Sequence, residues 1–288
     1  MRFIIIIFLC CSCQSVLSTL PQINSCPKKT LPSEKKDWFY TKNKSRGLVL
    51  LAHGLNLNPE KMNSLSLFYN SIGLDVYRPI LDGHQGSIES MKKLELGRWI
   101  VNSHQHYCQA KSYAQHHSLP LYFSGYSLGA LIHLYLQEEF DHVHYDKQIL
   151  LAPAINLPWY ANLIKVLYLF GDQFLVPTLN IKDYQAQKGT SIAGYKMLFN
   201  TVKKLQHIGL KKSNIPSLIF MSKNDELVSY HGIERMIKKY HLGQWKMVPI
   251  NNRQSKLKGK FSHLVIDPLS LGENQWSFMI EKIQRFLK

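Results

Sequence analysis

Residues 125–129 read Gly-Tyr-Ser-Leu-Gly, a G-x-S-x-G pattern that can turn a serine into a nucleophile. The apolar run at 119–124 is typical of a short buried strand, and the run at 130–139 is typical of a helix. A sharp turn between strand and helix exposes the serine hydroxyl at the helix N-terminus, where free N–H groups favour developing negative charge. We therefore predict that Ser127 is a catalytic nucleophile.

A serine nucleophile needs a general base and an acid that orients the base, and both follow Ser127 in the chain. Asp225 comes directly after a predicted strand, and His263 lies between the last predicted strand and the last predicted helix. Serine, then acid, then histidine is one of the known chain orders of this triad. We predict that Asp225 orients His263, in preference to the adjacent Glu226 and to Asp267, which follows the histidine.

The oxyanion of an acyl-transfer intermediate needs two backbone N–H donors. One predicted donor is the N–H of Leu128, next to the nucleophile. The other is the N–H of Leu55, which lies in the turn after the predicted strand 47–52. Gly54 permits an open conformation of this turn. Three histidines are assigned structural roles instead, with rings bonded to loop backbone: His53, His84 and His133.

The elements that position these residues alternate along the chain between apolar, strand-like runs and helical stretches. The predicted strands are 47–52, 74–79, 119–124, 147–152, 215–221 and 244–249, and the predicted helices are about 58–72, 94–117, 130–139 and 273–287. This alternation predicts an α/β fold with a mostly parallel, doubly wound sheet, in one domain of residues 46–288.

Residues 156–210 interrupt the alternation with an apolar and aromatic segment. An insertion at this point of the chain can cover a site at the carboxyl ends of the strands. We expect it to be a helical cap or lid; the alternative is an extra helix packed on the core.

Residues 1–20 have the pattern of an export signal, with one positive charge, an apolar run at 3–9 and small residues after it. The run is too short for a comfortable membrane span. Cys13 is the candidate for lipid attachment, as in a bacterial lipoprotein. We predict an exported protein that is periplasmic, anchored as a lipoprotein, or secreted.

Residues 21–45, rich in proline and lysine, are predicted to be a linker. Cleavage of the signal would leave Cys26 and Cys108, which could pair in an oxidising compartment. We favour free or buried thiols, because a core of this size needs no covalent staple.

The net charge of +16 is spread over scattered lysines. No helix carries a continuous basic stripe with interleaved aromatics, so we expect no nucleic-acid partner. A basic exported protein can lie against an anionic membrane surface; a solvated lysine-rich surface is the alternative. No cysteine or histidine pair has ligand spacing with supporting context, so neither a metal nor a cofactor is predicted.

Six short motifs follow one another along the chain: Leu-Ala-His-Gly-Leu at 51–55, Asp-Gly-His-Gln-Gly-Ser at 82–87, the serine motif at 125–129, Leu-Ala-Pro-Ala at 151–154, Asn-Asp at 224–225 and Ser-His at 262–263. With them the chain resembles the α/β-hydrolases of the monoacylglycerol lipase and lysophospholipase type, a group that includes serine aminopeptidases, over about residues 46–288. Two positions depart from that family: Asn56 replaces the second glycine of its H-G-x-G segment, and Gln85 stands where glycine is common.

The resemblance implies a serine hydrolase that cleaves carboxylic esters through an acyl-enzyme. The apolar insertion could shield an acyl chain, so the expected substrates are lipid-like esters such as monoacylglycerol or lysophospholipid. Two alternatives stay open. Peptide or amide cleavage needs an anionic subsite, and residues 156–210 hold only Asp172 and Asp183 as acids. A non-catalytic surface binding module would have no need of all three triad residues.

Overall fold

The computed structural model describes residues 23, 25–27, 37–178, 181–257 and 261–288. The predicted export signal at 1–20 and Cys13 lie outside the described residues. Of the described helices, none combines the length and the apolar character that a membrane span requires.

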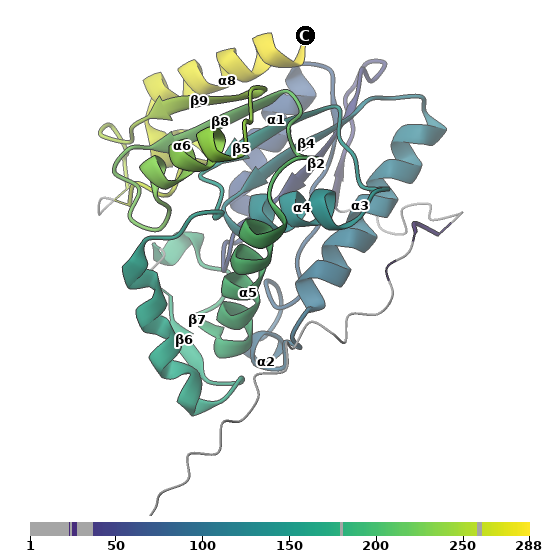
Figure 1. Cartoon of the computed structure of the whole chain (residues 1–288). Coiled ribbons are helices and arrows are strands. Elements are labelled where there is room, and N and C mark those ends of the chain that lie inside the picture. Colours follow the sequence, from purple (N-terminus) through teal and green to yellow (C-terminus); the bar gives the residue numbers. More distant parts are fainter. Residues whose placement is uncertain (1–22, 24, 28–36, 179–180, 258–260) are drawn as a thin grey trace, which may run out of the picture.

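In the described part of the chain, the central sheet has seven strands in the order β1-β3-β2-β4-β5-β8-β9, and helices lie on both of its faces (Figure 1). All neighbours in the sheet pair in parallel except β1 and β3. The strands are β1 (Trp38–Phe39), β2 (Leu48–Ala52), β3 (Asp75–Tyr77), β4 (Leu121–Tyr126), β5 (Lys147–Leu151), β8 (Ser217–Ser222) and β9 (Trp245–Ile250).

The inner strands are continuous apolar runs because helices cover both faces of a parallel sheet. Every residue of β2, β4 and β8 is buried. The helices are α1 (Asn63–Ser71), α2 (Ile88–Lys92), α3 (Arg98–His116), α4 (Leu128–Glu139), α5 (Ile192–Ile208), α6 (Tyr230–Lys239), α7 (Pro268–Leu271) and α8 (Glu273–Leu287). The predicted α/β fold with a mostly parallel sheet is confirmed.

The segment between β5 and β8 projects from one end of the sheet, at the lower left of Figure 1. It contains the 3-10 helices η4 (Trp159–Phe170) and η5 (Lys182–Tyr184), the antiparallel strands β6 (Leu175–Pro177) and β7 (Gly189–Ser191), and helix α5. Helix α5 packs against α4, whereas η4 has no buried residue. We call this segment the cap below.

The boundary predicted at residue 46 is wrong, because the sheet begins within the expected linker. Strand β1 pairs with β3 and forms the edge of the sheet. The Trp38 ring is 6% exposed and stacks on Tyr77 with 4.4 Å between ring centroids. A strand of two residues gives no readable alternation, and its stability comes from burial of the indole.

The expectation of free thiols is also wrong, since Cys26 and Cys108 form a disulfide. Cys108 is buried on α3, and the segment around Cys26 reaches it across a sequence separation of 82 residues. The bond ties the N-terminal segment to the folded domain. The size of the core was the reason to expect free thiols, but pairing depends on whether the folded chain brings the two cysteines together.

The substitution Cys26→Ser should lower the free energy of unfolding by about 2–4 kcal/mol, because the crosslink closes a long loop in the unfolded chain. Urea denaturation in the presence of a chelator would measure this change. Reduction of the wild-type protein should cost the same free energy, while a reductant should leave the Cys26→Ser variant unchanged. A variant as stable as the oxidised wild type would show that the crosslink adds no stability.

Candidate active site

The turn between β4 and α4 holds Ser127 in a strained backbone conformation, with φ of 49° and ψ of −112°. Its flanking glycines are required by close contacts. A Cβ on Gly125 would lie 2.4 Å from the Phe123 ring, and one on Gly129 would lie 2.6 Å from the His53 carbonyl oxygen. The backbone N–H of Ser127 donates to the carbonyl of Leu151 at the end of β5. The turn is therefore fixed between the two central strands.

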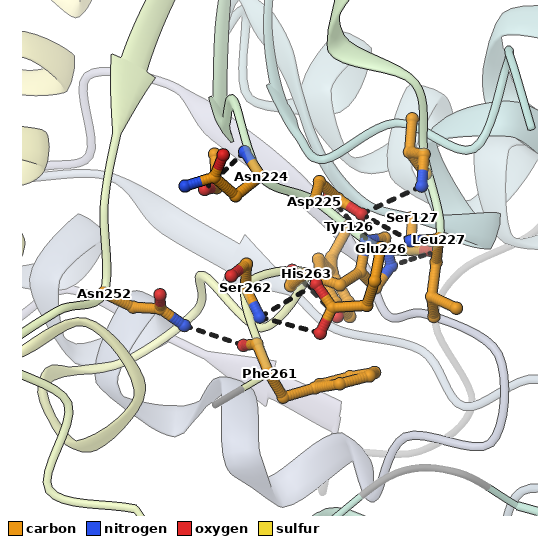
Figure 2. Close-up of polar contacts among 12 residues, drawn as sticks. Tyr126, Ser127, Asn224, Asp225, Glu226, Leu227, Asn252, Phe261, Ser262 and His263 are labelled. Atoms are coloured by element: carbon orange, nitrogen blue, oxygen red, sulfur yellow. Dashed lines mark hydrogen bonds and ion pairs between the residues drawn. The ribbon is translucent and has the colours of Figure 1, made fainter. Parts of the chain in front are cut away.

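Ser127, His263 and Asp225 form one hydrogen-bonded chain of side chains (Figure 2). The Nε2 atom of His263 lies 2.8 Å from Ser127 Oγ, and its Nδ1 atom lies 2.8 Å and 3.0 Å from the two carboxylate oxygens of Asp225. The side chains of His263 and Asp225 are 4% and 0% exposed. This arrangement can remove the proton from Ser127 and stabilise the imidazolium that forms.

The carboxylate of Asp225 is held by its own loop as well as by His263. Its Oδ1 atom accepts hydrogen bonds from the backbone N–H groups of Leu227 at 2.9 Å and Val228 at 2.8 Å. These bonds fix the direction of the carboxylate. The loop after β8 therefore aims Asp225 at the histidine.

The two competing acids have other partners. Glu226 accepts the backbone N–H of Ser262 at 2.8 Å and 3.0 Å, so it holds the histidine loop. Asp267 accepts the hydroxyl of Tyr184 at 2.7 Å and caps α7 through the N–H of Ser270. Neither acid has a hydrogen bond to His263 among these contacts. Burial raises the pKa of Glu226 above its ordinary value.

Tyr126 is a site residue that the sequence did not single out. Its hydroxyl donates to the backbone carbonyl of His263, and the two rings lie 5.2 Å apart between centroids. Tyr126 occupies the variable second position of the serine motif, so the pattern itself carries no signal for it. Its contact supports the loop on which the histidine is placed.

The two predicted oxyanion residues, Leu55 and Leu128, line the same cavity as Ser127 and His263. Gly54 allows this approach, because a Cβ there would lie 2.6 Å from the Tyr126 ring. Leu128 begins α4, so its N–H is one of the groups that have no acceptor within the helix. Their role as oxyanion donors stays a prediction.

The predicted structural histidines are fixed by hydrogen bonds in the loops. His53 Nε2 accepts the N–H of Leu81 at 3.0 Å, and its Nδ1 lies 3.0 Å from the Gly54 carbonyl. His84 Nε2 accepts the N–H of Asn56 at 2.9 Å. Burial lowers the pKa of His84 to about 4 and that of His53 well below its usual range, so both rings are neutral near pH 7. His133 lies on α4, and its Nδ1 atom lies 2.7 Å from the Tyr145 hydroxyl.

Asn56, the departure from the family pattern, connects the loop of Leu55 to the cap. Its backbone lies in the left-handed region, with φ of 48°, which asparagine tolerates better than most residues. Its Nδ2 donates to the Gln187 carbonyl at 2.9 Å, and its Oδ1 accepts the Gln187 N–H at 2.8 Å. The side chain thus makes two hydrogen bonds to the cap at a position where the family has glycine.

The substitution Asn56→Gly tests this connection, because glycine keeps the backbone conformation and removes only the side chain. We expect kcat/KM for hydrolysis of the ester substrates that the sequence predicts to fall by about 10–100-fold, since the adjacent N–H of Leu55 loses its fixed position. Asn56→Asp keeps the acceptor and loses the donor, so its kcat/KM should lie between that of the wild type and that of Asn56→Gly. Steady-state kinetics would measure both variants. Wild-type activity in Asn56→Gly would show that the two bonds are dispensable.

The catalytic side chains open into a cavity of about 290 Å³ between the sheet and the cap. Its lining is largely apolar and comes from both parts of the molecule. The cap contributes Leu157, Ala161, Leu163, Ile164, Leu198 and Phe199. The cavity can hold an apolar chain whose reactive end lies against Ser127.

Comparisons with known proteins give the family and the fold of this chain. The family model described as serine aminopeptidase, S33 (Hydrolase_4) matches residues 43–192. No curated protein sequence matches the chain.

Among solved structures, a soluble variant of monoglyceride lipase from Saccharomyces cerevisiae has a TM-score of 0.70 at 16% identity, over 87% of this chain and 90% of that chain. A structure from work on the metagenome-derived lipolytic enzymes LipS and LipT has a TM-score of 0.66 at 17% identity, over 90% and 99%. The monoacylglycerol lipase of Paleococcus ferrophilus has a TM-score of 0.60 at 18% identity, over 86% and 97%. At these identities the likeness shows the fold alone.

Proposed function

We propose, on the premise that this chain belongs to the serine aminopeptidase (S33) family of α/β-hydrolases, that it is a serine hydrolase of carboxylic esters. The observation that carries the proposal is the hydrogen-bonded chain from Ser127 through His263 to Asp225 at the wall of an apolar cavity. The lipases and lipolytic enzymes among its structural neighbours support the same reaction class.

In the proposed reaction, His263 Nε2 takes the proton of Ser127 Oγ while Oγ attacks the ester carbonyl. The N–H groups of Leu55 and Leu128 stabilise the oxyanion of the tetrahedral intermediate. His263 then gives the proton to the leaving alkoxide, and the acyl group stays on Ser127. Water, deprotonated by His263, attacks this acyl-enzyme; the acid is released and Ser127 regains its proton.

Lipid-like esters are the substrates that the cap favours. Its η4 helix exposes large apolar side chains to solvent, which is uncommon in soluble proteins unless the surface binds something. Trp159 is 77% exposed and Leu169 is 89% exposed. The net charge of +16 adds attraction to anionic lipid. We therefore propose that the enzyme works next to a membrane surface on substrates such as monoacylglycerol or lysophospholipid.

The cavity is a poor match for a substrate with a free amine. Glu226 is the one acidic residue in the lining among the residues that the structure describes. Both of its carboxylate oxygens are bonded to the N–H of Ser262. An aminoacyl substrate needs an accessible anion near the scissile bond, so esters are preferred over aminoacyl amides.

The test combines labelling with a substrate panel. A fluorophosphonate probe should label the folded protein at Ser127 and should label neither the Ser127→Ala variant nor the denatured chain, while the exposed Ser90→Ala variant should label normally. The unlabelled wild-type protein should hydrolyse acylglycerols and lysophospholipids faster than aminoacyl amides, and prior labelling of Ser127 should abolish this activity. Folded protein that takes no label would argue for a binding module, and faster amide cleavage would reverse the substrate assignment.

A further inference from the structure

A cluster of two cysteines and two histidines lies away from the catalytic residues. His104 and Cys108 are four residues apart on α3 and so occupy the same face of that helix. Cys26, in the N-terminal segment, and His142, in the loop after α4, complete the cluster. One ligand atom from each of Cys26, His104 and His142 lies within 4.8 Å of the others, and Cys26 is bonded to Cys108.

The nitrogen–sulfur distance in this cluster is close to that of a tetrahedral zinc site, whereas the two bonded sulfur atoms must separate before they can bind an ion. Zinc bond lengths imply nitrogen–sulfur separations of roughly 3.6 Å and nitrogen–nitrogen separations of roughly 3.3 Å. His104 Nε2 lies 3.6 Å from Cys108 Sγ and 2.7 Å from His142 Nε2. A small rotation of the His142 ring would open the second distance. The thiolates can then occupy the other two corners once the disulfide is broken.

The loop that carries His142 is already held against α3. The carbonyl of His142 accepts the hydroxyl of Tyr107 at 2.9 Å and the ammonium of Lys111 at 2.8 Å. The same tyrosine hydroxyl accepts the N–H of His144 at 2.9 Å. Three of the four ligands are thus positioned by one helix and by a loop bonded to it.

We propose that Cys26, Cys108, His104 and His142 form a Zn²⁺ site when the disulfide is reduced, so that the disulfide and the ion are alternative states of one cluster. An external dithiol or phosphine supplies two electrons and becomes oxidised, while the S–S bond takes up two protons to give two thiols. Zn²⁺ then displaces these two protons and binds two thiolates and two imidazoles.

The site would be structural, since its His142 loop leads into the amino end of β5 whereas Ser127 follows the carboxyl end of β4. It would keep the N-terminal segment attached to α3 where a reducing environment opens the disulfide. The sequence predicts no metal because the four ligands lie at 26, 104, 108 and 142, without a compact motif. The proposal does not depend on the proposed ester hydrolysis.

Cobalt titration of the purified full-length protein tests the proposal. Protein reduced with a phosphine under nitrogen should bind one Co²⁺ and show the visible absorption of tetrahedral, thiolate-bound cobalt. One equivalent of Zn²⁺ should displace it. The oxidised protein should show no such absorption. Cys26→Ser and His142→Ala should each weaken binding more than the ~10–100-fold typical of losing an outer partner of a metal ligand.

The exposed His144→Ala variant is the matched control, because it removes a histidine from the same loop and keeps the backbone bond to Tyr107. It should bind cobalt like the wild type. Circular dichroism would establish that each variant is folded before titration. The proposal is overturned if the reduced wild type binds no cobalt, if oxidised and reduced proteins bind it equally, or if folded His142→Ala binds it as tightly as the wild type.

Discussion

Replacing Ser127 with alanine is expected to lower kcat for ester hydrolysis by about 10⁴–10⁶-fold and to leave the free energy of unfolding nearly unchanged. Its hydroxyl contacts the His263 ring at 2.8 Å, and the turn is fixed by backbone bonds and flanking glycines that alanine does not disturb. Single-turnover kinetics with a chromogenic ester would measure the loss, and thermal denaturation would check the fold.

The hydrogen bond between Ser127 and His263 leads to a second prediction, which concerns the double variant of these two residues. Because Ser127 and His263 act as one unit, the double variant Ser127→Ala with His263→Ala should be scarcely slower than either single variant. His231→Ala, at an exposed histidine, is the control and should retain full activity. Losses that multiply in the double variant would mean that the two side chains act independently, which contradicts the proposed mechanism.

The catalytic geometry could be predicted because each of the three residues follows an apolar run that reads as a strand. Ser127 follows β4, Asp225 follows β8 and His263 follows β9, and the carboxyl ends of parallel strands meet at one edge of the sheet. Local pattern and topology together therefore place side chains that are 136 residues apart within hydrogen-bond distance.

The features that could not be predicted from the sequence are very short elements and contacts between segments that are distant in the chain. Strand β1 has two residues, too few to show an alternation of apolar and polar side chains. Helix α2 has five residues, too few to show a helical repeat. The bonds between Asn56 and Gln187 join residues 131 positions apart, so no local pattern contains them. The Cys26–Cys108 bond is of the same kind. Each of these features depends on which distant segments the tertiary fold brings together.

The cap shows the limit of hydrophobic patterns. An apolar run predicts burial, and the run at 158–170 does contribute to the cavity lining. Yet η4 has no buried residue, and it lies at the outer side of the cap (Figure 1). The sequence gives the chemical character of this helix, while only the tertiary structure shows that its apolar side chains face solvent.

The substitution Asp225→Asn is expected to lower kcat by on the order of 10⁴-fold with little change in KM. An amide at this position can donate a hydrogen bond to Nδ1 of His263, which would put the ring proton on Nε2, the atom that must accept the proton of Ser127. The charge that stabilises the imidazolium is also lost. The fold should tolerate the change, because the amide oxygen can still accept the N–H groups of Leu227 and Val228. Steady-state kinetics with a chromogenic ester would measure the loss.

The competing acids provide matched controls for this experiment. Glu226→Gln keeps an acceptor for the N–H of Ser262, and Asp267→Asn keeps an acceptor for the N–H of Ser270 at the cap of α7, while its amide N–H can donate to the Tyr184 hydroxyl. Both variants should stay within about tenfold of wild-type kcat, since the hydrogen bonds of Glu226 go to the N–H of Ser262 and those of Asp267 go to Tyr184 and Ser270. If Glu226→Gln lost as much activity as Asp225→Asn, the orienting role would belong to the loop as a whole. If Glu226→Gln alone were inactive, Glu226 would replace Asp225 as the acid of the triad.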